Sequence, residues 1–274
     1  MSKRFSLQVN RGARTKVMGI LNVTPDSFSD GGRYNRLNAA VDRAHELVKA
    51  GADLIDIGGE STRPGYTPVP AEEEMERVIP VIEAISARMD VPISIDTYKA
   101  KTAKAAVHAG AAIINDVWGA KADPEMATVA ANLAVPIILM HNRENMNYQS
   151  FMEDVKADLQ ESIDICLRAG VQKQQIWLDP GVGFAKTYEQ NLEVIRELDQ
   201  IVEMGLPVLL GTSRKSLIAK TLNLPVEERI EGTGATICLG IAKGCQIIRV
   251  HDVKEMARMA IMMDAMLKRS DDVG

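Results

Sequence analysis

Polar side chains gather where short apolar runs of this sequence stop. In chain order they are Asn22, Asp56, Glu60, Asp96, Asn115, His141, Asp179, Ser213, Lys215, Arg249 and His251. Carboxylates and an amide such as Asp96, Asn115 and Asp179 can satisfy a planar heterocycle that has an exocyclic amine and ring N–H groups. Two carboxylates close together would normally raise one pKa, unless a ligand donates hydrogen bonds to both. These residues therefore predict a site for a nitrogen heterocycle.

A second group of polar residues is typical of phosphate binding. Arg249 and His251 end the last apolar run, and Lys215 lies in the stretch Ser-Arg-Lys-Ser at residues 213–216. Barrel enzymes commonly bind phosphate beside their last two strands. We therefore expect a phosphate or pyrophosphate site here. Residues 181–186 lack the third glycine of a dinucleotide site, and no GxxxxGK[ST] motif occurs, so a kinase or an NAD enzyme is disfavoured.

The apolar runs that carry these residues are short, rich in Ile, Val and Leu, and apolar throughout rather than alternating. They cover residues 16–23, 54–59, 93–98, 113–119, 136–141, 176–179, 207–213 and 246–251. This pattern is typical of strands covered on both faces of a parallel sheet. Amphipathic stretches between them predict helices, among them residues 71–88, 99–109, 151–169 and 189–204. The alternation predicts an α/β fold, a single (β/α)8 TIM barrel over residues 1–274, rather than an open doubly wound sheet.

Composition limits the possible partners. The 274 residues are 46% hydrophobic and 25% charged, as in ordinary globular proteins, and the net charge of −5 argues against nucleic acid as a partner. No stretch is long enough for a membrane span, and the first residues lack the apolar run of a signal peptide. Cys166, Cys238 and Cys245 form no CxxC pair, which suits a reducing compartment. We expect a cytoplasmic protein that binds neither nucleic acid nor membrane.

Two long loops follow the first two predicted strands, at residues 24–32 and 60–65. Both are rich in proline, glycine and small polar residues, which suits mobile lids. Phe28 gives the first loop an aromatic contact, and Arg63 gives the second a cationic one. The alternative is a pair of ordinary Ω-loops without a catalytic role.

Eight segments, spread in order along the chain, carry a family resemblance: GILNVTPDSFSDGG (19–32), DIGGESTRPG (56–65), PISIDT (92–97), IINDV (113–117), LMH (139–141), LDPGVGFAK (178–186), GTSRKS (211–216) and RVHDV (249–253). They resemble the dihydropteroate synthases, which are pterin-binding TIM barrels. The resemblance implies that 4-aminobenzoate displaces pyrophosphate from 6-hydroxymethyl-7,8-dihydropterin diphosphate, giving 7,8-dihydropteroate in folate synthesis. It also implies an SN1-like displacement, with Mg²⁺ as cofactor.

The resemblance assigns roles to particular residues. The pterin would contact Asp96, Asn115, Asp179, Lys215, Met140 and Phe184, and the diphosphate would contact Asn22, Arg249 and His251, with Asn22 also the ligand of Mg²⁺. The 4-aminobenzoate would contact Phe28, Thr62, Arg63, Pro64 and Ser216. The catalytic residues would be Asp30, Asp96, Lys215, Arg249 and His251.

The resemblance further implies a homodimer formed by late helices. Five methionines at helical spacing, Met256, Met259, Met262, Met263 and Met266, could belong to the core or to that interface. Two alternatives remain for the function. One is a methyltetrahydrofolate methyltransferase-like barrel, which would share the pterin residues but has no use for a diphosphate site. The other is an inactive pterin-binding paralogue, which would require damage in the lids or the cation cluster.

Overall fold

The computed structural model describes residues 7, 9–10, 12–24, 33–60 and 68–271. These residues form eight parallel strands, in the neighbour order β6-β5-β4-β3-β2-β1-β8-β7. A bridge between Leu178 and Val208 joins β6 to β7 and completes the ring. The strands are β1 (Lys16–Asn22), β2 (Leu54–Gly58), β3 (Ile93–Asp96), β4 (Ile113–Asp116), β5 (Ile137–Met140), β6 (Ile176–Asp179), β7 (Leu209–Leu210) and β8 (Ile247–Val250). The predicted (β/α)8 barrel is confirmed.

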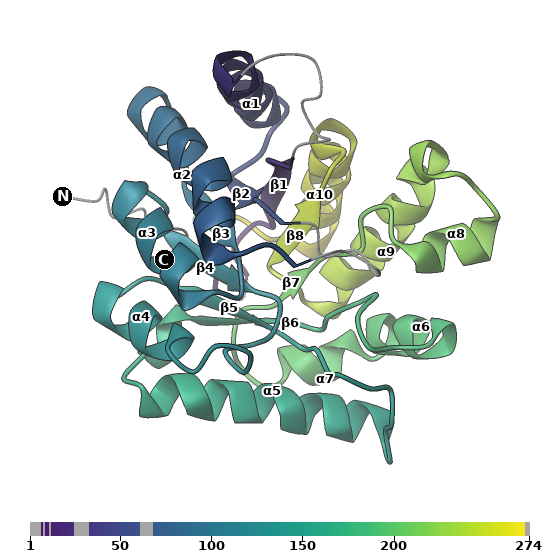
Figure 1. Ribbon diagram of the computed structural model, residues 1–274. Helices are drawn as coiled ribbons and strands as arrows, with labels where there is room; N and C mark the ends of the chain where they lie inside the picture. The colour runs from purple at the N-terminus through teal and green to yellow at the C-terminus, as the bar shows by residue number, and fades with distance from the viewer. Residues whose placement is uncertain (1–6, 8, 11, 25–32, 61–67, 272–274) are drawn as a thin grey trace.

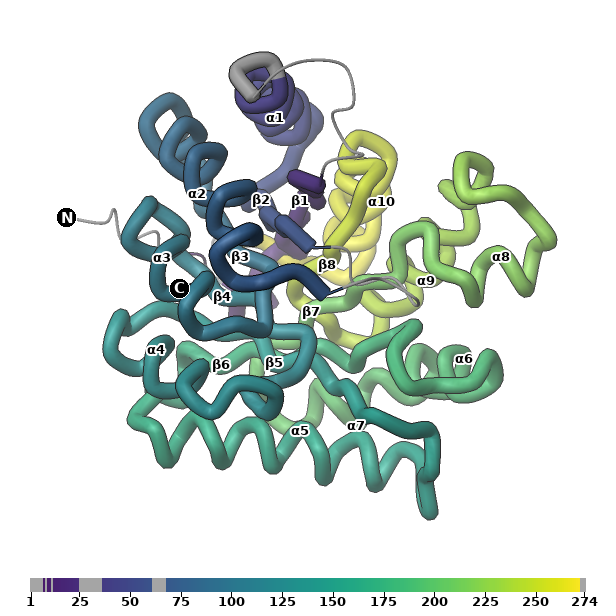
Figure 2. Tube along the Cα trace, in the orientation of Figure 1, coloured from purple at the N-terminus to yellow at the C-terminus, as the bar shows by residue number. Residues whose placement is uncertain are grey.

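Helices surround this ring of strands (Figure 1). They are α1 (Arg33–Lys49), α2 (Ala71–Arg88), α3 (Ala100–Ala109), α4 (Met126–Leu133), α5 (Phe151–Arg168), α6 (Tyr188–Arg196), α7 (Leu198–Val202), α8 (Ser216–Leu222), α9 (Ile230–Lys243) and α10 (Val253–Leu267), with 3₁₀ turns η2 (Lys173–Gln175) and η3 (Val226–Glu228). The tube in Figure 2 follows the same alternation of inner strand and outer helix along the chain. Within the described residues, none of the helices combines the length and apolar character that a membrane span requires.

Two elements differ from the sequence-based expectation. The predicted strand at residues 207–213 is reduced to Leu209–Leu210, because sheet pairing ends before Gly211. The predicted helix at residues 189–204 divides at Glu197, whose ψ of 22° is not helical. No glycine or proline marks this break. Packing decides it, since Leu198 directly after the break is fully buried.

The barrel interior is built in layers, because side chains alternate along each strand. The lower layer is a separate apolar cluster that takes one side chain from most strands: Met18, Leu54, Ile113, Ile138, Trp177, Leu209 and Ile247, with Val9 beside them. Residues two positions further along the same strands point the same way. They include Asp56, Asn115, Met140, Asp179 and Arg249, and β3 adds Asp96 opposite Gly58. An apolar floor therefore supports a polar layer at the carboxyl ends of the strands.

Candidate active site

An arginine between two buried carboxylates forms the centre of the polar layer. Arg249 donates from Nε to Oδ2 of Asp56 at 2.6 Å, and from Nη2 to Oδ2 of Asp96 at 2.6 Å. The side-chain amide of Asn115 donates to the same oxygen of Asp56 at 3.1 Å. Asp56 is fully buried, and the side chain of Arg249 is 20% exposed. The hydrogen bonds therefore join β2, β3, β4 and β8 across the barrel mouth.

Hydrogen bonding in this centre is incomplete. Oδ1 of Asp56, Oδ1 of Asp96 and Oγ of Ser94 are buried and have no hydrogen-bond partner among the described residues. Buried polar atoms are normally paired, and each unpaired group costs about 1–3 kcal/mol. Carboxylate oxygens left in this way can accept hydrogen bonds from the N–H groups of a ligand, so the arrangement suits a bound donor.

Burial shifts the pKa values of the ionisable groups in this centre. Burial raises the pKa of Asp96 to about 7, since the nearby carboxylate of Asp56 adds to it and Arg249 only partly offsets it. Burial also raises the pKa of Asp179, although the Lys215 ammonium opposes this. Burial lowers the pKa of Lys215 to about 8. Perturbed carboxylates and a perturbed amine in one concave region are typical of functional sites.

The expected pterin residues of the later strands lie together. Asp179 accepts from the backbone N–H of Gly181 at 2.8 Å through Oδ1. Its Oδ2 lies 3.8 Å from the place a Cβ on Gly211 would take, so this glycine leaves space beside the carboxylate. The Lys215 ammonium donates to the backbone carbonyl of Val182 and lies 4.8 Å from the centre of the Phe184 ring.

Met140 ends β5 and is 4% exposed, on the inward side of the barrel. The pterin set thus comes from the ends of β3 to β6 and from the loops after β6 and β7. Ser216, expected to contact 4-aminobenzoate, is the exposed first residue of α8.

The expected diphosphate residues come from β1 and β8. Asn22 is the exposed last residue of β1. Its Oδ1 and Oδ2 of Asp96 lie 3.9 and 3.7 Å from the position of a Cβ on Gly58, so both oxygens face the same small space. His251 follows β8; its Nδ1 lies 3.0 Å from Oγ of Ser213, and its backbone N–H donates to that oxygen at 3.1 Å.

Five predicted site residues, Phe28, Asp30, Thr62, Arg63 and Pro64, lie outside the described residues. The residues that flank the second loop are held firmly. Glu60 accepts from the Tyr98 hydroxyl at 3.0 Å and from the backbone N–H of Val69 at 3.2 Å, and it pairs with Lys99. Lys99 also pairs with the buried Glu74 at 2.9 Å. Residues 60 and 69 therefore have fixed positions on either side of that loop.

Sequence reasoning missed two features of the site. Asp56 was recognised as a polar strand end but received no role, although its inward position and its place two residues after the apolar Leu54 could have indicated one. Lys186 received no role either. Its ammonium lies 2.7 Å from Nδ1 of His141 beneath the loop after β6. Nothing in the local sequence marks this contact, since 45 residues separate the two side chains.

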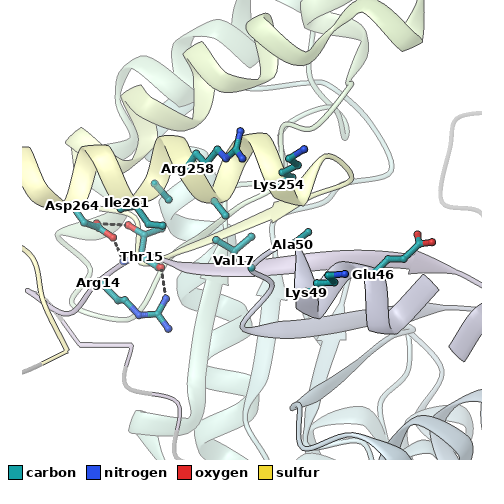
Figure 3. A pocket seen from close by; sticks show the side chains of 13 residues that line it. Arg14, Thr15, Val17, Glu46, Lys49, Ala50, Lys254, Arg258, Ile261 and Asp264 are labelled. Carbon is teal, nitrogen blue, oxygen red and sulfur yellow. Dashed lines mark hydrogen bonds between the residues drawn. The ribbon is translucent and has the colours of Figure 1, made fainter. Parts of the chain in front are cut away.

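A groove of about 500 Å³ lies elsewhere, between α1 and α10 beside the beginning of β1 (Figure 3). Arg14, Lys49 and Arg258 are among its lining residues. Thr15 and Asp264, also in its wall, are joined by hydrogen bonds of 2.8 Å. Because β1 begins here and ends at Asn22, the groove is at the opposite end of the strands from the polar layer.

Comparison with known proteins assigns this chain to a family. The model of a family described as pterin binding enzyme matches residues 18–251. The dihydropteroate synthase of Bacillus subtilis (strain 168) is 61% identical over 256 residues, which are 93% of this chain and 90% of that relative. The predicted family resemblance is thus confirmed in sequence.

Solved structures agree. Dihydropteroate synthase from Clostridium difficile, crystallised in the presence of pteroic acid, has a TM-score of 0.93 at 50% identity over 94% of this chain and 99% of that chain. The Xanthomonas albilineans enzyme with 4-aminobenzoic acid has a TM-score of 0.89 at 42% identity over 93% of each chain. With matches of this extent, the chain belongs to the dihydropteroate synthases, the pterin-binding transferases of folate synthesis.

Proposed function

We propose that this chain joins 4-aminobenzoate to 6-hydroxymethyl-7,8-dihydropterin diphosphate, forming 7,8-dihydropteroate and releasing pyrophosphate. One observation carries the proposal. At the strand ends, Asp56 and Asp96 each keep a buried oxygen that has no partner in the described part of the chain, next to the Arg249 guanidinium. A ligand with several N–H donors and a charged leaving group would use both features. The relatives solved with pteroic acid and with 4-aminobenzoic acid support the same substrates.

The pterin would be held by acceptors on one side and a cation on the other. Its amino-pyrimidine N–H groups would donate to Asp179 and meet Asn115, while Lys215 would lie near the oxo group. Donation to Asp96 from the other ring would favour its ionised form, against the burial that raises its pKa to about 7. Met140 and the Phe184 ring would border the flat faces.

The bond to pyrophosphate would break before the new C–N bond is complete. Its electron pair leaves with the pyrophosphate, and the methylene carbon becomes a cation that the electron-rich dihydropterin ring delocalises. Arg249 and His251 would stabilise the departing charge, and the Asp96 carboxylate, with Asp30, would face the cation. The arylamine nitrogen then donates its lone pair to this carbon to form the C–N bond, and the resulting ammonium releases a proton to water. Because an arylamine is neutral at pH 7, orientation matters more than a general base.

Mg²⁺ is the expected cofactor, and the donors fit it. Oδ1 of Asn22 and Oδ2 of Asp96 face the space that Gly58 leaves open. Within the part of the chain that the structure describes, no three His, Cys, Asp or Glu side chains form a protein cage for a metal. Mg²⁺ usually takes one or two protein oxygens together with phosphate oxygens and waters. Asn22 would therefore hold an ion that arrives with the diphosphate and neutralises part of its charge.

A homodimer through α10 also belongs to the proposal. Met256 is fully buried and is part of the core, whereas Met262 and Met266 are 59% and 58% exposed. Ile261 on the same helix is 68% exposed. Adjacent exposed apolar side chains commonly mark an interface. The methionine stripe thus divides into a core part and a part available to a second copy of the chain.

The decisive experiment measures pyrophosphate release from the dihydropterin diphosphate with and without 4-aminobenzoate. We expect release to depend on the arylamine and to match formation of dihydropteroate one to one. A protein that binds the pterin diphosphate but forms no arylamine-dependent product would be the inactive paralogue, and would overturn the proposal. Varying the arylamine tests the order of events, since a dissociative reaction changes little in rate with arylamine nucleophilicity.

A further inference from the structure

A buried lysine ends the loop after β6, the loop that also carries Phe184 of the expected pterin set. Lys186 is only 8% exposed, and its ammonium contacts three acceptors. These are the carbonyl of Gly181 at 3.0 Å, the carbonyl of Phe184 at 3.1 Å and Nδ1 of His141 at 2.7 Å. Burial lowers the pKa of Lys186 to about 7. The three acceptors match the three donors of the protonated form and favour it.

His141, the third acceptor of Lys186, is itself held in place by a carboxylate. Its side chain is fully buried, and Nε2 lies 3.0 Å from Oδ2 of Asp158. Since Lys186 donates to Nδ1, the ring proton is on Nε2 and points to Asp158. Burial lowers the pKa of His141 to about 4, so the ring stays a neutral acceptor for the lysine at neutral pH. Arg143 also donates to Asp158, at 3.2 Å to Oδ1, and fixes that carboxylate.

The loop over Lys186, residues 181–186, is held at its backbone carbonyls. The Tyr148 hydroxyl donates to the carbonyl of Ala185 at 2.8 Å, beside the two carbonyls that Lys186 holds. Gly181 has a φ of +66°, and a Cβ there would lie 1.9 Å from the carbonyl oxygen of His141. Only glycine allows this approach. The loop after β6 thus packs with its backbone directly against the loop after β5.

This loop carries the groups that orient Lys215. The carbonyl of Val182 accepts the hydrogen bond of the Lys215 ammonium, and the Phe184 ring lies 4.8 Å from it. The methylene groups of Lys215 also pack on Gly183, whose Cβ position lies 3.0 Å from Cδ of the lysine. The place of the Lys215 charge therefore depends on where residues 182–184 are held.

We propose that Lys186 is a positioning residue for pterin recognition. By fixing the carbonyls of Gly181 and Phe184 against His141, it sets the Val182 carbonyl and the Phe184 ring, and through them the direction of Lys215. Its three hydrogen bonds go to the His141 ring and to two backbone carbonyls of residues 181–186. The inference rests on the proposed function only in taking the ligand to be a pterin.

The test replaces Lys186 with methionine, an unbranched side chain one heavy atom shorter, which removes the donors. Lys16→Met is the matched control. Lys16 is also buried, at 4% exposure, but it pairs with Asp271 at 2.6 Å at the beginning of β1. Tyr148→Phe is a milder variant that acts on the same loop from outside it, because it removes only the donor to the Ala185 carbonyl. Steady-state kinetics, calorimetric binding of the dihydropterin diphosphate alone and amide hydrogen exchange of residues 180–186 are measured for all three.

We expect Lys186→Met to raise KM and Kd for the pterin diphosphate about tenfold, while KM for 4-aminobenzoate and kcat change less than about twofold. Hydrogen exchange of residues 180–186 should accelerate, and Tyr148→Phe should follow in the same direction with a smaller effect. Lys16→Met should change none of these, even if it lowers the melting temperature.

An unchanged pterin KM in Lys186→Met, or equal losses in both KM values and kcat as expected from general destabilisation, would overturn the positioning role. If Lys186→Met fails to fold, Tyr148→Phe alone decides between these outcomes. A wild-type protein without arylamine-dependent turnover would contradict the proposed function instead. In that case calorimetric pterin binding and hydrogen exchange still test the lysine.

Discussion

Two arginines, one at each end of the barrel, each join two aspartates, but their surroundings differ. At the amino end, Arg14 donates to Asp53 at 2.9 Å and to Asp271 at 2.6 Å. Asp53 also accepts the backbone N–H of Val17 at 2.8 Å, and Lys16 binds the other oxygen of Asp271 at 2.6 Å. Every carboxylate oxygen in this network has a partner.

At the carboxyl end, Arg249 contacts Asp56 and Asp96 with similar distances, yet one oxygen of each carboxylate has no partner within residues 12–24, 33–60 and 68–271. The amino-end network is complete and half exposed, as its 41% exposed Arg14 side chain shows. The carboxyl-end network is buried and incomplete. The number of unpartnered oxygens, rather than the presence of an arginine and two aspartates, distinguishes a binding site from a structural ion pair.

Replacing Arg249 should have the largest effect on activity. Arg249→Met should lower kcat/KM by a factor of the order of 10³, because the departing charge loses its main cation. Stability should also fall, by about 3 kcal/mol at pH 8, since two buried carboxylates lose their counter-charge. The loss should be smaller at pH 5, where a carboxylate can take up a proton.

The matched variant Arg14→Met should keep kcat/KM within about twofold and cost roughly 1 kcal/mol of stability. Urea unfolding at both pH values and steady-state kinetics give the comparison. Equal losses of activity in the two variants would show that the networks do not differ in function.

Asp96→Asn should produce a smaller loss of activity together with a gain in stability. We expect kcat/KM to fall about 10²-fold, because the carboxylate no longer faces the developing cation. The folded-state pKa of about 7 lies above the ordinary value of 3.8, so the folded protein binds its proton more tightly than the unfolded chain. Wild-type stability therefore decreases as the pH rises from about 4 to 7.

Asparagine removes that contribution, so the variant should be more stable than the wild type at pH 8, by an amount of the order of 1 kcal/mol, and similar to it near pH 4. Urea unfolding across this pH range measures the difference. A variant that is less stable at pH 8 would mean that the ionised carboxylate contributes to the fold.

The smallest effect should come from Asp53→Asn in the amino-end network. Loss of the charge on a carboxylate that accepts from Arg14 and from the Val17 backbone should lower the free energy of unfolding by about 1 kcal/mol. Its side-chain partners among the described residues, Arg14 and the Val17 backbone, lie at the amino end, so kcat and both KM values should stay at the wild-type level. A change in the pterin KM would show that the amino-end network influences substrate binding, and would contradict the contrast between the two networks.

Much of this arrangement follows from sequence periodicity. Apolar runs of the right length predicted the strands, and their polar ends placed Asp96, Asn115 and Asp179 on one rim because the strands are parallel. The two-residue alternation also places Asp56 and Arg249 inward, on the same side as Leu54 and Ile247. Family motifs then gave the expected chemistry, which composition alone does not contain.

Contacts between side chains of different strands could not be predicted from the sequence. Arg249 was expected near the diphosphate and Asp96 near the pterin, and their 2.6 Å hydrogen bond depends on the stagger of β8, β1, β2 and β3. That stagger is set by barrel closure, which no local pattern encodes. The Lys186–His141 contact and the break at Glu197 depend on tertiary packing in the same way.

The brevity of β7 has a consequence for how the protein responds to substrate. β5 and β6 share four paired residues and β7 and β8 share two, but β6 and β7 meet through the single bridge between Leu178 and Val208. This is the seam where local opening would disturb the fewest backbone bonds. Asp179 is on one side of it and Lys215 follows on the other. A pterin that contacts both residues would bind only the closed form of this seam. Its binding would therefore lower the population of locally opened barrel, and opening of the seam would weaken the affinity for the pterin.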